Sequence, residues 1–284
     1  MKKIKKIHKA VSAPIADLTT FRALPTGSVE HLDPFLFLNH HGPQKYGPEN
    51  RGLPFGPHPH RGFETLTFIL QGDIVHKDSG GGQDKITAGG VQWMTAGRGV
   101  IHTEISSEEF KEKGGMEEVI QLWFNLPAKL KMTKPAYTGL QKDQIPEIKA
   151  DGGNVNIYPV SGNWEGQEGP IKSLTGIEIA RFKMKAGSSY SMEVPEGRNV
   201  LFYVVNGEVR VNGSAAATHN LAEFSHEGEE ILIVATQDSE LIFGHAEPFN
   251  EPIVAHGPFV MNSEKQIMEA MRDYQMGKMG VWTE

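Results

Sequence analysis

Two short segments of the sequence each carry metal-ligating side chains two residues apart. His58 is followed by His60, and His102, just after two closely spaced glycines, is followed by Glu104. Side chains two apart on an extended strand share a face, about 7 Å from each other, so each pair could approach one ion from one side. Imidazole and carboxylate ligands suit borderline divalent metals. If neighbouring strands bring the pairs together, they predict a site of three histidines and one carboxylate, with room for water or substrate.

Glu64 is a second candidate for the carboxylate. It shares the parity of His58 and His60 if the strand continues without interruption, although Arg61-Gly62 is a plausible bulge. The residues alone therefore leave open whether Glu64 or Glu104 is the ligand.

Four side chains close to these motifs could assist binding. Arg61 and Arg98 could steady an anion, although a structural salt bridge is the simpler role for each. Phe63 and Trp93 could line an aromatic pocket, and packing in the core accounts for them equally well.

The other nine histidines are expected to have structural or surface roles. His40 and His41 are the first to reconsider, because they lie shortly before the first pair. The remaining seven are His8, His31, His76, His219, His226, His245 and His256.

The elements around these motifs read as short strands separated by turns. The chain has 32 glycines and 17 prolines, and between them lie apolar runs of strand length. These runs are residues 64–70, 155–160, 177–182, 201–205, 231–235 and 240–243. Many short strands with close turns predict an all-β sandwich or barrel. One helix is expected near the end, where Ser263 and Gln266 form a capping box and Ile267, Met271 and Tyr274 follow at helical spacing.

An internal repeat is visible at an offset of 135 residues. Residues 66–74 align with 201–209, and both read as a buried strand ending in a polar residue, a glycine and an acid. The repeat predicts two β-domains joined near residues 135–150. At the same offset His58, His60 and Glu64 become Glu193, Pro195 and Asn199, which predicts a second domain without a metal.

Composition narrows the classes of protein further. The 284 residues carry a formal charge of −7 and no cysteine, which argues against a general nucleic-acid binder and excludes thiolate sites and disulfides. Apolar runs are far shorter than the roughly 20 residues of a membrane span. The basic start, Met1 to Lys9, has no apolar region after it, so we expect an edge strand and not a secretory signal. A cytoplasmic protein is the default expectation.

The motifs together resemble those of the pirin family, within the cupins. The resemblance rests on His58-Pro-His-Arg-Gly-Phe-Glu-Thr65, Gln92-Trp-Met-Thr-Ala-Gly-Arg-Gly99 and His102-x-Glu104, with 32–36 and 251–262 fitting as well. It covers nearly the whole chain. Gly97 and Ser106 depart from the generic cupin motif, which has proline and asparagine there, but they do not affect the narrower match.

The resemblance implies a bicupin of two jelly-roll β-sandwich domains with a short C-terminal helix. Residues 1–140 would hold the metal and residues 141–284 would not. By this resemblance His58, His60, His102 and Glu104 are the ligands of Fe(II), with Mn, Co, Ni, Cu or Zn as alternatives. Glu64 would then accept a hydrogen bond beside the metal ligands.

The implied activity is that of a quercetin 2,3-dioxygenase acting on a flavonol-like substrate and dioxygen. Glu104, or Glu64 if it lies behind the ligands, would take the proton of the flavonol 3-hydroxyl. The alternative is a non-catalytic, iron-dependent redox sensor that regulates a protein partner, and a scaffold with a vestigial metal is a third. Neither direct nucleic-acid binding nor membrane binding is expected.

Overall fold

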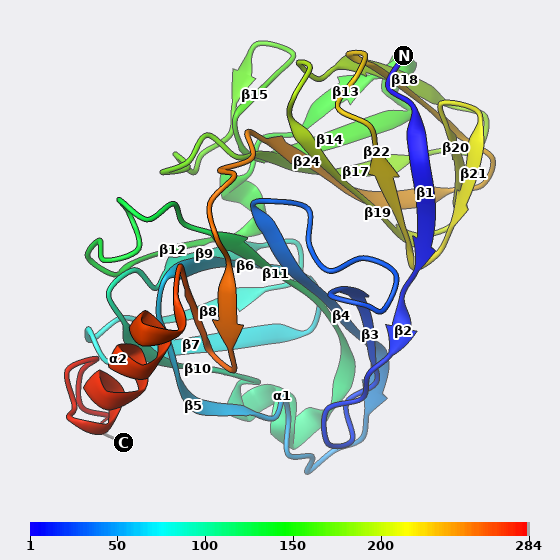
Figure 1. The fold of residues 1–284 in the computed structure, drawn as a ribbon. Helices are drawn as coiled ribbons and strands as arrows, with labels where there is room; N and C mark the ends of the chain where they lie inside the picture. Colours follow the sequence, from blue (N-terminus) through cyan, green and yellow to red (C-terminus); the bar gives the residue numbers. More distant parts are fainter. Residues whose placement is uncertain (283–284) are drawn as a thin grey trace. The chain divides into compact units, whose positions relative to one another are not determined.

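The computed structural model describes residues 1–282, which form two compact units (Figure 1). The N unit is built around Phe37–Lys142 and also contains Ser12–Thr20 and the chain from Phe249 onward. The C unit is built around Asp143–Pro248 and also contains Met1–Val11 and Phe21–Leu36. The expected division was 1–140 and 141–284. The units differ from it at both ends of the chain, because Met1–Val11 and Phe21–Leu36 belong to the C unit and the chain from Phe249 onward belongs to the N unit.

The N unit contains one sheet of four strands and most of a sheet of seven. The small sheet has the order β5 (Phe55–His60), β10 (Val100–Ile105), β7 (Asp73–Asp78) and β8 (Gln83–Thr87). The large sheet has the order β12 (Ala136–Leu140), β9 (Val91–Thr95), β6 (Phe63–Gln71), β11 (Gly115–Asn125), β4 (Phe35–Tyr46), β3 (Thr20–Leu24) and β2 (Val11–Ser12). Helix α1 (Glu108–Lys113) joins β10 to β11, and a hairpin of β25 (Val254–His256) and β26 (Phe259–Met261) precedes helix α2 (Glu264–Gln275).

The C unit repeats this plan. Its small sheet has the order β18 (Ser189–Glu193), β23 (Glu230–Ala235), β20 (Glu208–Val211) and β21 (Ser214–Ala217). Its large sheet has the order β1 (Ile4–Lys9), β22 (Asn220–Phe224), β19 (Asn199–Asn206), β24 (Ser239–Ala246), β17 (Glu178–Met184), β14 (Val155–Ser161) and β13 (Ile148–Ala150). A short hairpin of β15 (Asn163–Trp164) and β16 (Gln167–Glu168) and 3₁₀ turns at Lys142–Gln144 and Asp151–Gly153 complete it.

The N-terminal strand β1 completes the sheet of the C unit. It pairs with β22 at the sheet edge, where β12 pairs with β9 in the N unit (Figure 1). The predicted edge strand is therefore confirmed. The repeated sheet order also confirms the all-β fold with two cupin-type sandwiches and a short C-terminal helix.

Alternating apolar side chains fill each sandwich. In β19, Val200, Phe202 and Val204 join a buried cluster with Phe182 of β17 and Phe243 of β24. The intervening side chains of β19 are buried too, which explains why this strand is a continuous apolar run and not an alternating one.

Helix α2 begins where the capping box predicted. The Ser263 hydroxyl accepts a hydrogen bond from the backbone N–H of Gln266 at 3.3 Å, and Ile267 and Ala270 are its buried residues. These two pack in a cluster with Ile101 of β10, next to His102. Within the described residues, no helix has the length and apolar character needed to cross a bilayer.

Candidate metal centre

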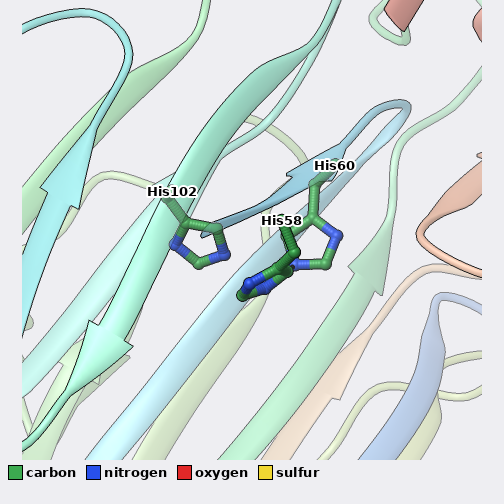
Figure 2. Close-up of side chains that lie close together, drawn as sticks. All are labelled: His58, His60 and His102. Carbon is green, nitrogen blue, oxygen red and sulfur yellow. Dashed lines mark hydrogen bonds between the residues drawn. The ribbon is translucent and has the colours of Figure 1, made fainter. Parts of the chain in front are cut away.

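Three histidines from two paired strands converge in the N unit (Figure 2). His58 and His60 come from β5, and His102 of β10 lies directly opposite His58 in the antiparallel register. One ring nitrogen of each lies within 4.8 Å of the others. His60 and His102 are buried, whereas His58 is half-buried and gives the group its contact with solvent. The structure thus brings together the three imidazoles that the two motifs predicted.

A glycine turn ends β5 directly after the histidine pair. Gly62 has a φ of +90°, and a Cβ there would lie 1.9 Å from the carbonyl oxygen of Val260. No other residue fits this position, because the backbone conformation and the close approach both exclude a side chain. The turn carries the chain from β5 in the small sheet to β6 in the large one, so that His60 is the last residue of β5.

Backbone carbonyls orient two of the imidazoles. The Nδ1 atom of His58 lies 2.7 Å from the carbonyl oxygen of Gly56, and that of His60 lies 3.4 Å from the carbonyl oxygen of Pro258. A ring nitrogen facing a carbonyl oxygen carries the proton, so the lone pair of each ring is on Nε2. These two Nε2 atoms lie 3.1 Å apart. Two lone pairs facing each other repel unless a cation lies between or beside them.

The third imidazole has both nitrogens unsatisfied. Neither Nδ1 nor Nε2 of His102 has a hydrogen-bond partner among the described residues, although both are buried. Burial, reinforced by the neighbouring histidines, lowers the pKa of His102 well below its usual value, and burial lowers the pKa of His60 in the same way. Both rings are therefore neutral. A buried polar atom without a partner is costly, and a divalent cation would satisfy the His102 nitrogen that carries the lone pair, while the other nitrogen would carry the ring proton. The residues present fit such an ion.

Glu104 lies two residues beyond His102 and is held by the facing sheet. Its carboxylate accepts hydrogen bonds from Gln121 at 2.6 Å, from Thr67 at 3.0 Å and from Gln92. These three donors are cross-strand neighbours in one row of β11, β6 and β9. Glu104 is outside the group of three histidines, so its role as a metal ligand stays a prediction.

Glu64 points away from this group. Its Oε1 accepts a hydrogen bond from Thr95 at 2.6 Å, and Glu64 and Thr95 are cross-strand partners. Thr67, which binds Glu104, is three residues further along an unbroken strand and so lies on the opposite face of β6. Glu64 thus lies on the face of β6 opposite to Thr67, and its role beside the ligands or as the base stays a prediction. The parity count failed because the chain changes sheets at Gly62.

An aromatic wall adjoins His60, and sequence reasoning found only part of it. Trp123 of β11 lies 5.3 Å from His60, 4.5 Å from Phe63 and 4.5 Å from Phe37 between ring centroids. Phe37 and Trp123 are half-buried. Trp93 pairs with Leu66 on the face of β6 that carries Glu64, so it is not part of this wall. Trp123 had no signal of its own in the sequence, because its place beside His60 depends on which strands become neighbours.

Arg61 forms a structural salt bridge, the simpler of the two roles expected for it. Its Nε donates to the carbonyl oxygen of Arg98 at 2.6 Å, and its guanidinium pairs with Asp273 of α2 at 3.0 Å. Arg98 itself is exposed.

Three histidines of the N unit outside the triad form hydrogen bonds of their own. His40 pairs with Glu118 at 2.9 Å. The Nδ1 atom of His41 lies 2.8 Å from the hydroxyl of Thr20. His76 pairs with Asp78 at 2.9 Å.

Comparisons with known proteins agree with this architecture. The family model Pirin matches residues 17–124, and the model of the pirin C-terminal cupin domain matches residues 179–280. A protein of Pseudomonas aeruginosa named "Putative quercetin 2,3-dioxygenase" is 33% identical over 265 residues, 93% of this chain and 91% of its own. Pirin-1 of Arabidopsis thaliana is 40% identical over 258 residues, 88% of this chain and 84% of its own. The crystal structure of quercetin 2,3-dioxygenase from Acinetobacter baumannii superposes with a TM-score of 0.91 at 36% identity, covering 99% of both chains. With the repeated cupin sandwich and the histidine triad of its N unit, this chain belongs to the pirin family.

Proposed function

We propose that this protein is a metal-dependent dioxygenase of the quercetin 2,3-dioxygenase type that acts on flavonol-like substrates. The observation that carries the proposal is the convergence of three imidazoles, in which the Nε2 atoms of His58 and His60 face each other and neither nitrogen of the buried His102 has a hydrogen-bond partner among the described residues. The names of the Pseudomonas and Acinetobacter relatives support the substrate class.

His58, His60 and His102 would hold the ion, and Glu104 is the predicted fourth ligand. Fe(II) is the expected metal, and Mn, Co, Ni, Cu and Zn are compatible with the same donors. When bound, the ion would supply the Lewis acidity and the redox partner that dioxygen chemistry requires. The carbonyl oxygens of Gly56 and Pro258 would keep two of the rings in the tautomer that presents Nε2.

Glu104 would act on the substrate as the proton acceptor. Oxidative opening of a flavonol with loss of carbon monoxide begins with loss of the 3-hydroxyl proton, which needs a carboxylate within hydrogen-bond reach. Gln121 and Gln92 donate amide hydrogen bonds to this carboxylate and fix its position. Trp123 and Phe37 offer a flat apolar surface beside His60, on which the aromatic rings of a flavonol could stack.

Oxygen uptake with quercetin tests this function. The full chain loaded with Fe(II) should consume dioxygen and release carbon monoxide, and His60→Ala should abolish both. His31→Ala is the matched control, because His31 is exposed and outside the group. Absence of flavonol turnover by the loaded protein would refute the proposed dioxygenase activity. If a protein partner then bound in a manner that depended on the redox state of the iron, a regulatory function would be supported in place of the enzymatic one.

A further inference from the structure

A serine, a histidine and a glutamate form a chain of hydrogen bonds away from the metal centre. The Oγ atom of Ser28 lies 2.8 Å from Nδ1 of His8, and Nε2 of His8 lies 2.9 Å from Oε2 of Glu223. All three residues belong to the C unit. A hydroxyl, an imidazole and a carboxylate joined in this order are the parts of a site for nucleophilic catalysis.

Strand register brings His8 to Glu223. His8 of β1 pairs with Leu221 of β22, and Glu223 lies two residues beyond Leu221 in the same strand. Residues two apart on a strand share a face, so His8 and Glu223 are diagonal neighbours on one face of the sheet. The base therefore comes from the first strand of the chain and the acid from a strand more than 200 residues later, which no sequence spacing reveals.

Ser28 lies at the tip of a tight hairpin turn. Thr26 and Val29 exchange backbone hydrogen bonds of 2.8 and 3.3 Å around it. The hydroxyl of Thr26 lies 3.1 Å from that of Ser28 and accepts the backbone N–H of Ser28 at 3.3 Å. Ser28 is exposed, and a Cβ at the preceding Gly27 would meet nothing within 4 Å. The hydroxyl is thus held against His8 and remains open to a small molecule.

Glu223 sets the tautomer of the buried His8. A carboxylate oxygen facing Nε2 keeps the ring proton on that nitrogen, so the lone pair is on Nδ1 and faces the Ser28 hydroxyl. The other carboxylate oxygen of Glu223 lies 3.6 Å from Nζ of Lys5. An imidazole in this tautomer can accept the proton of the serine, and the carboxylate behind it stabilises the imidazolium that forms.

We propose that Ser28 is a nucleophile for acyl transfer from small activated esters, with His8 as its general base and Glu223 as the positioning residue. The Ser28 oxygen would attack the ester carbonyl while its proton passes to Nδ1 of His8. The bond from the carbonyl carbon to the alcohol oxygen would then break, and the alcohol would leave with that proton. Water, giving its proton to the same Nδ1, would release the carboxylic acid and restore the serine. The reaction needs only the ester and water, so it is independent of the function proposed for the N unit.

The position of Ser28 limits the class of ester. An exposed turn gives a substrate little surface to bind, which favours small esters with a good leaving group. The backbone N–H of Gly27, next to the nucleophile, has no hydrogen-bond partner among the described residues and would be one donor for the oxyanion. A single missing oxyanion donor costs about 10²–10³-fold in rate. Aryl esters, whose leaving groups need the least assistance, are therefore the substrates to test.

A fluorophosphonate probe tests the nucleophile on the full chain. The probe should label one serine per chain, and peptide mass spectrometry should place the label at Ser28. Ser28→Ala should abolish labelling, and His8→Gln should slow it about 10²–10⁴-fold. Ser189→Ala is the matched control and should label like the parent. Ser189 is an exposed serine of the same unit, and its hydroxyl bonds to no histidine in the described part of the chain.

Hydrolysis of p-nitrophenyl acetate is the second readout. Ser28→Ala should lose the activity while its urea unfolding midpoint stays that of the parent, because Ser28 is exposed. Glu223→Gln should lower the rate at least about tenfold, since an amide can hold the ring but cannot balance the imidazolium charge. Labelling of Ser28 no faster than of Ser189, or hydrolysis that survives Ser28→Ala, would overturn the proposal. Hydrolysis that a chelator abolishes and added metal restores would assign the activity to the N unit and would overturn it as well.

Discussion

At the scale of single residues, the site depends on which nitrogen of each neutral imidazole carries the proton. His58 and His60 are locked by backbone carbonyls into the tautomer that directs Nε2 to the centre, and His102 contributes two unsatisfied nitrogens. None of this is visible in a motif, which supplies only the residue type and the spacing. The carbonyl of Pro258 comes from a segment nearly 200 residues away.

Glu104→Gln separates the base from the metal ligands. The amide is isosteric but cannot accept the proton of a flavonol 3-hydroxyl, so quercetin turnover should fall about 10²–10⁴-fold. Because the three imidazoles remain and the amide oxygen of glutamine can still coordinate, the variant should bind one metal ion per chain, although more weakly than the parent. Steady-state oxygen uptake and metal analysis of the same sample provide the check. Complete loss of the metal together with turnover would show instead that the variant is inactive because it lacks the ion, and not because it lacks the base.

Glu117 should make stability depend on pH. Burial, and secondarily Asp73, raises the pKa of Glu117 to about 9. A carboxyl whose pKa is raised in the folded state favours folding fully below its unfolded pKa, and this contribution is lost as pH rises from about 4.5 to about 9. Glu117→Gln should therefore become more stable than the parent by a few kcal/mol near pH 8.5, with little difference near pH 5.

Urea unfolding at pH 5, 7 and 8.5 measures this difference. Glu112→Gln is the control, because Glu112 is an exposed glutamate of the same unit. Parallel stability curves for the parent and Glu117→Gln would contradict the buried, neutral carboxyl.

The sequence revealed the histidines more readily than their surroundings. Side chains two residues apart lie on the same face of a strand wherever that strand lies in the sheet. His58, His60 and His102 could therefore be found from spacing and resemblance. Parity with His58 and His60 suggested that Glu64 faces the same way, but this count ran across a change of sheet at Gly62. For Trp93 the sequence offered a pocket wall or core packing equally, and Trp93 is buried in the core. Gln92 and Gln121 had no signal of their own, since their role depends on which strands become neighbours.

At the scale of elements, the turn at Gly62 sets the direction of the second histidine. Gly62→Ala should cost at least about 3 kcal/mol, because the Cβ would meet the Val260 carbonyl in a left-handed backbone conformation. Gly152→Ala is the matched control: Gly152 has a φ of +64° but nothing within 4 Å, so the cost there should be about 1 kcal/mol. Chemical denaturation compares the two. Equal costs would mean that the close approach at Gly62 does not matter.

Elements with strong local signals were the predictable ones. The start of α2 could be predicted because the Ser263 hydroxyl accepts a hydrogen bond from the backbone N–H of Gln266 within one turn. Strand register carried no such signal. The offset of 135 residues makes Glu193 the counterpart of His58, but Met192 is the residue that lies opposite Ile231 as His58 lies opposite His102. This one-residue shift appears only when both strands are paired.

At the scale of the whole molecule, the two units exchange terminal segments. The repeat predicted two β-domains, but nothing in the first nine residues shows that β1 belongs with β22 in the other half of the chain. The sequence of an edge strand does not reveal its partner, since strands pair through backbone groups that every residue other than proline has. Its position is settled by packing, here of Ile4 and Ile7 against the core of the C unit.

Deletion of residues 1–9 should therefore destabilise the C unit selectively. The deletion exposes the edge of β22 and removes the contact of His8 with Glu223 at 2.9 Å. Hydrogen exchange should rise in β22 and β19 and stay unchanged in β6 and β9. A control that removes two of the five lysines of this segment, Lys5→Gln with Lys9→Gln, keeps the strand and should preserve protection. Uniform loss of protection in both units would contradict the division described above.

The most direct test of the metal centre is a titration of the metal-free full chain with Co²⁺, followed by visible absorption. The account predicts one ion per chain with the spectrum of a histidine-rich site. It also predicts loss of that binding in His102→Ala and retention in His31→Ala. A chain that binds no Co²⁺, or that binds it equally well without the His102 imidazole, would contradict the metal centre on which the proposed function rests.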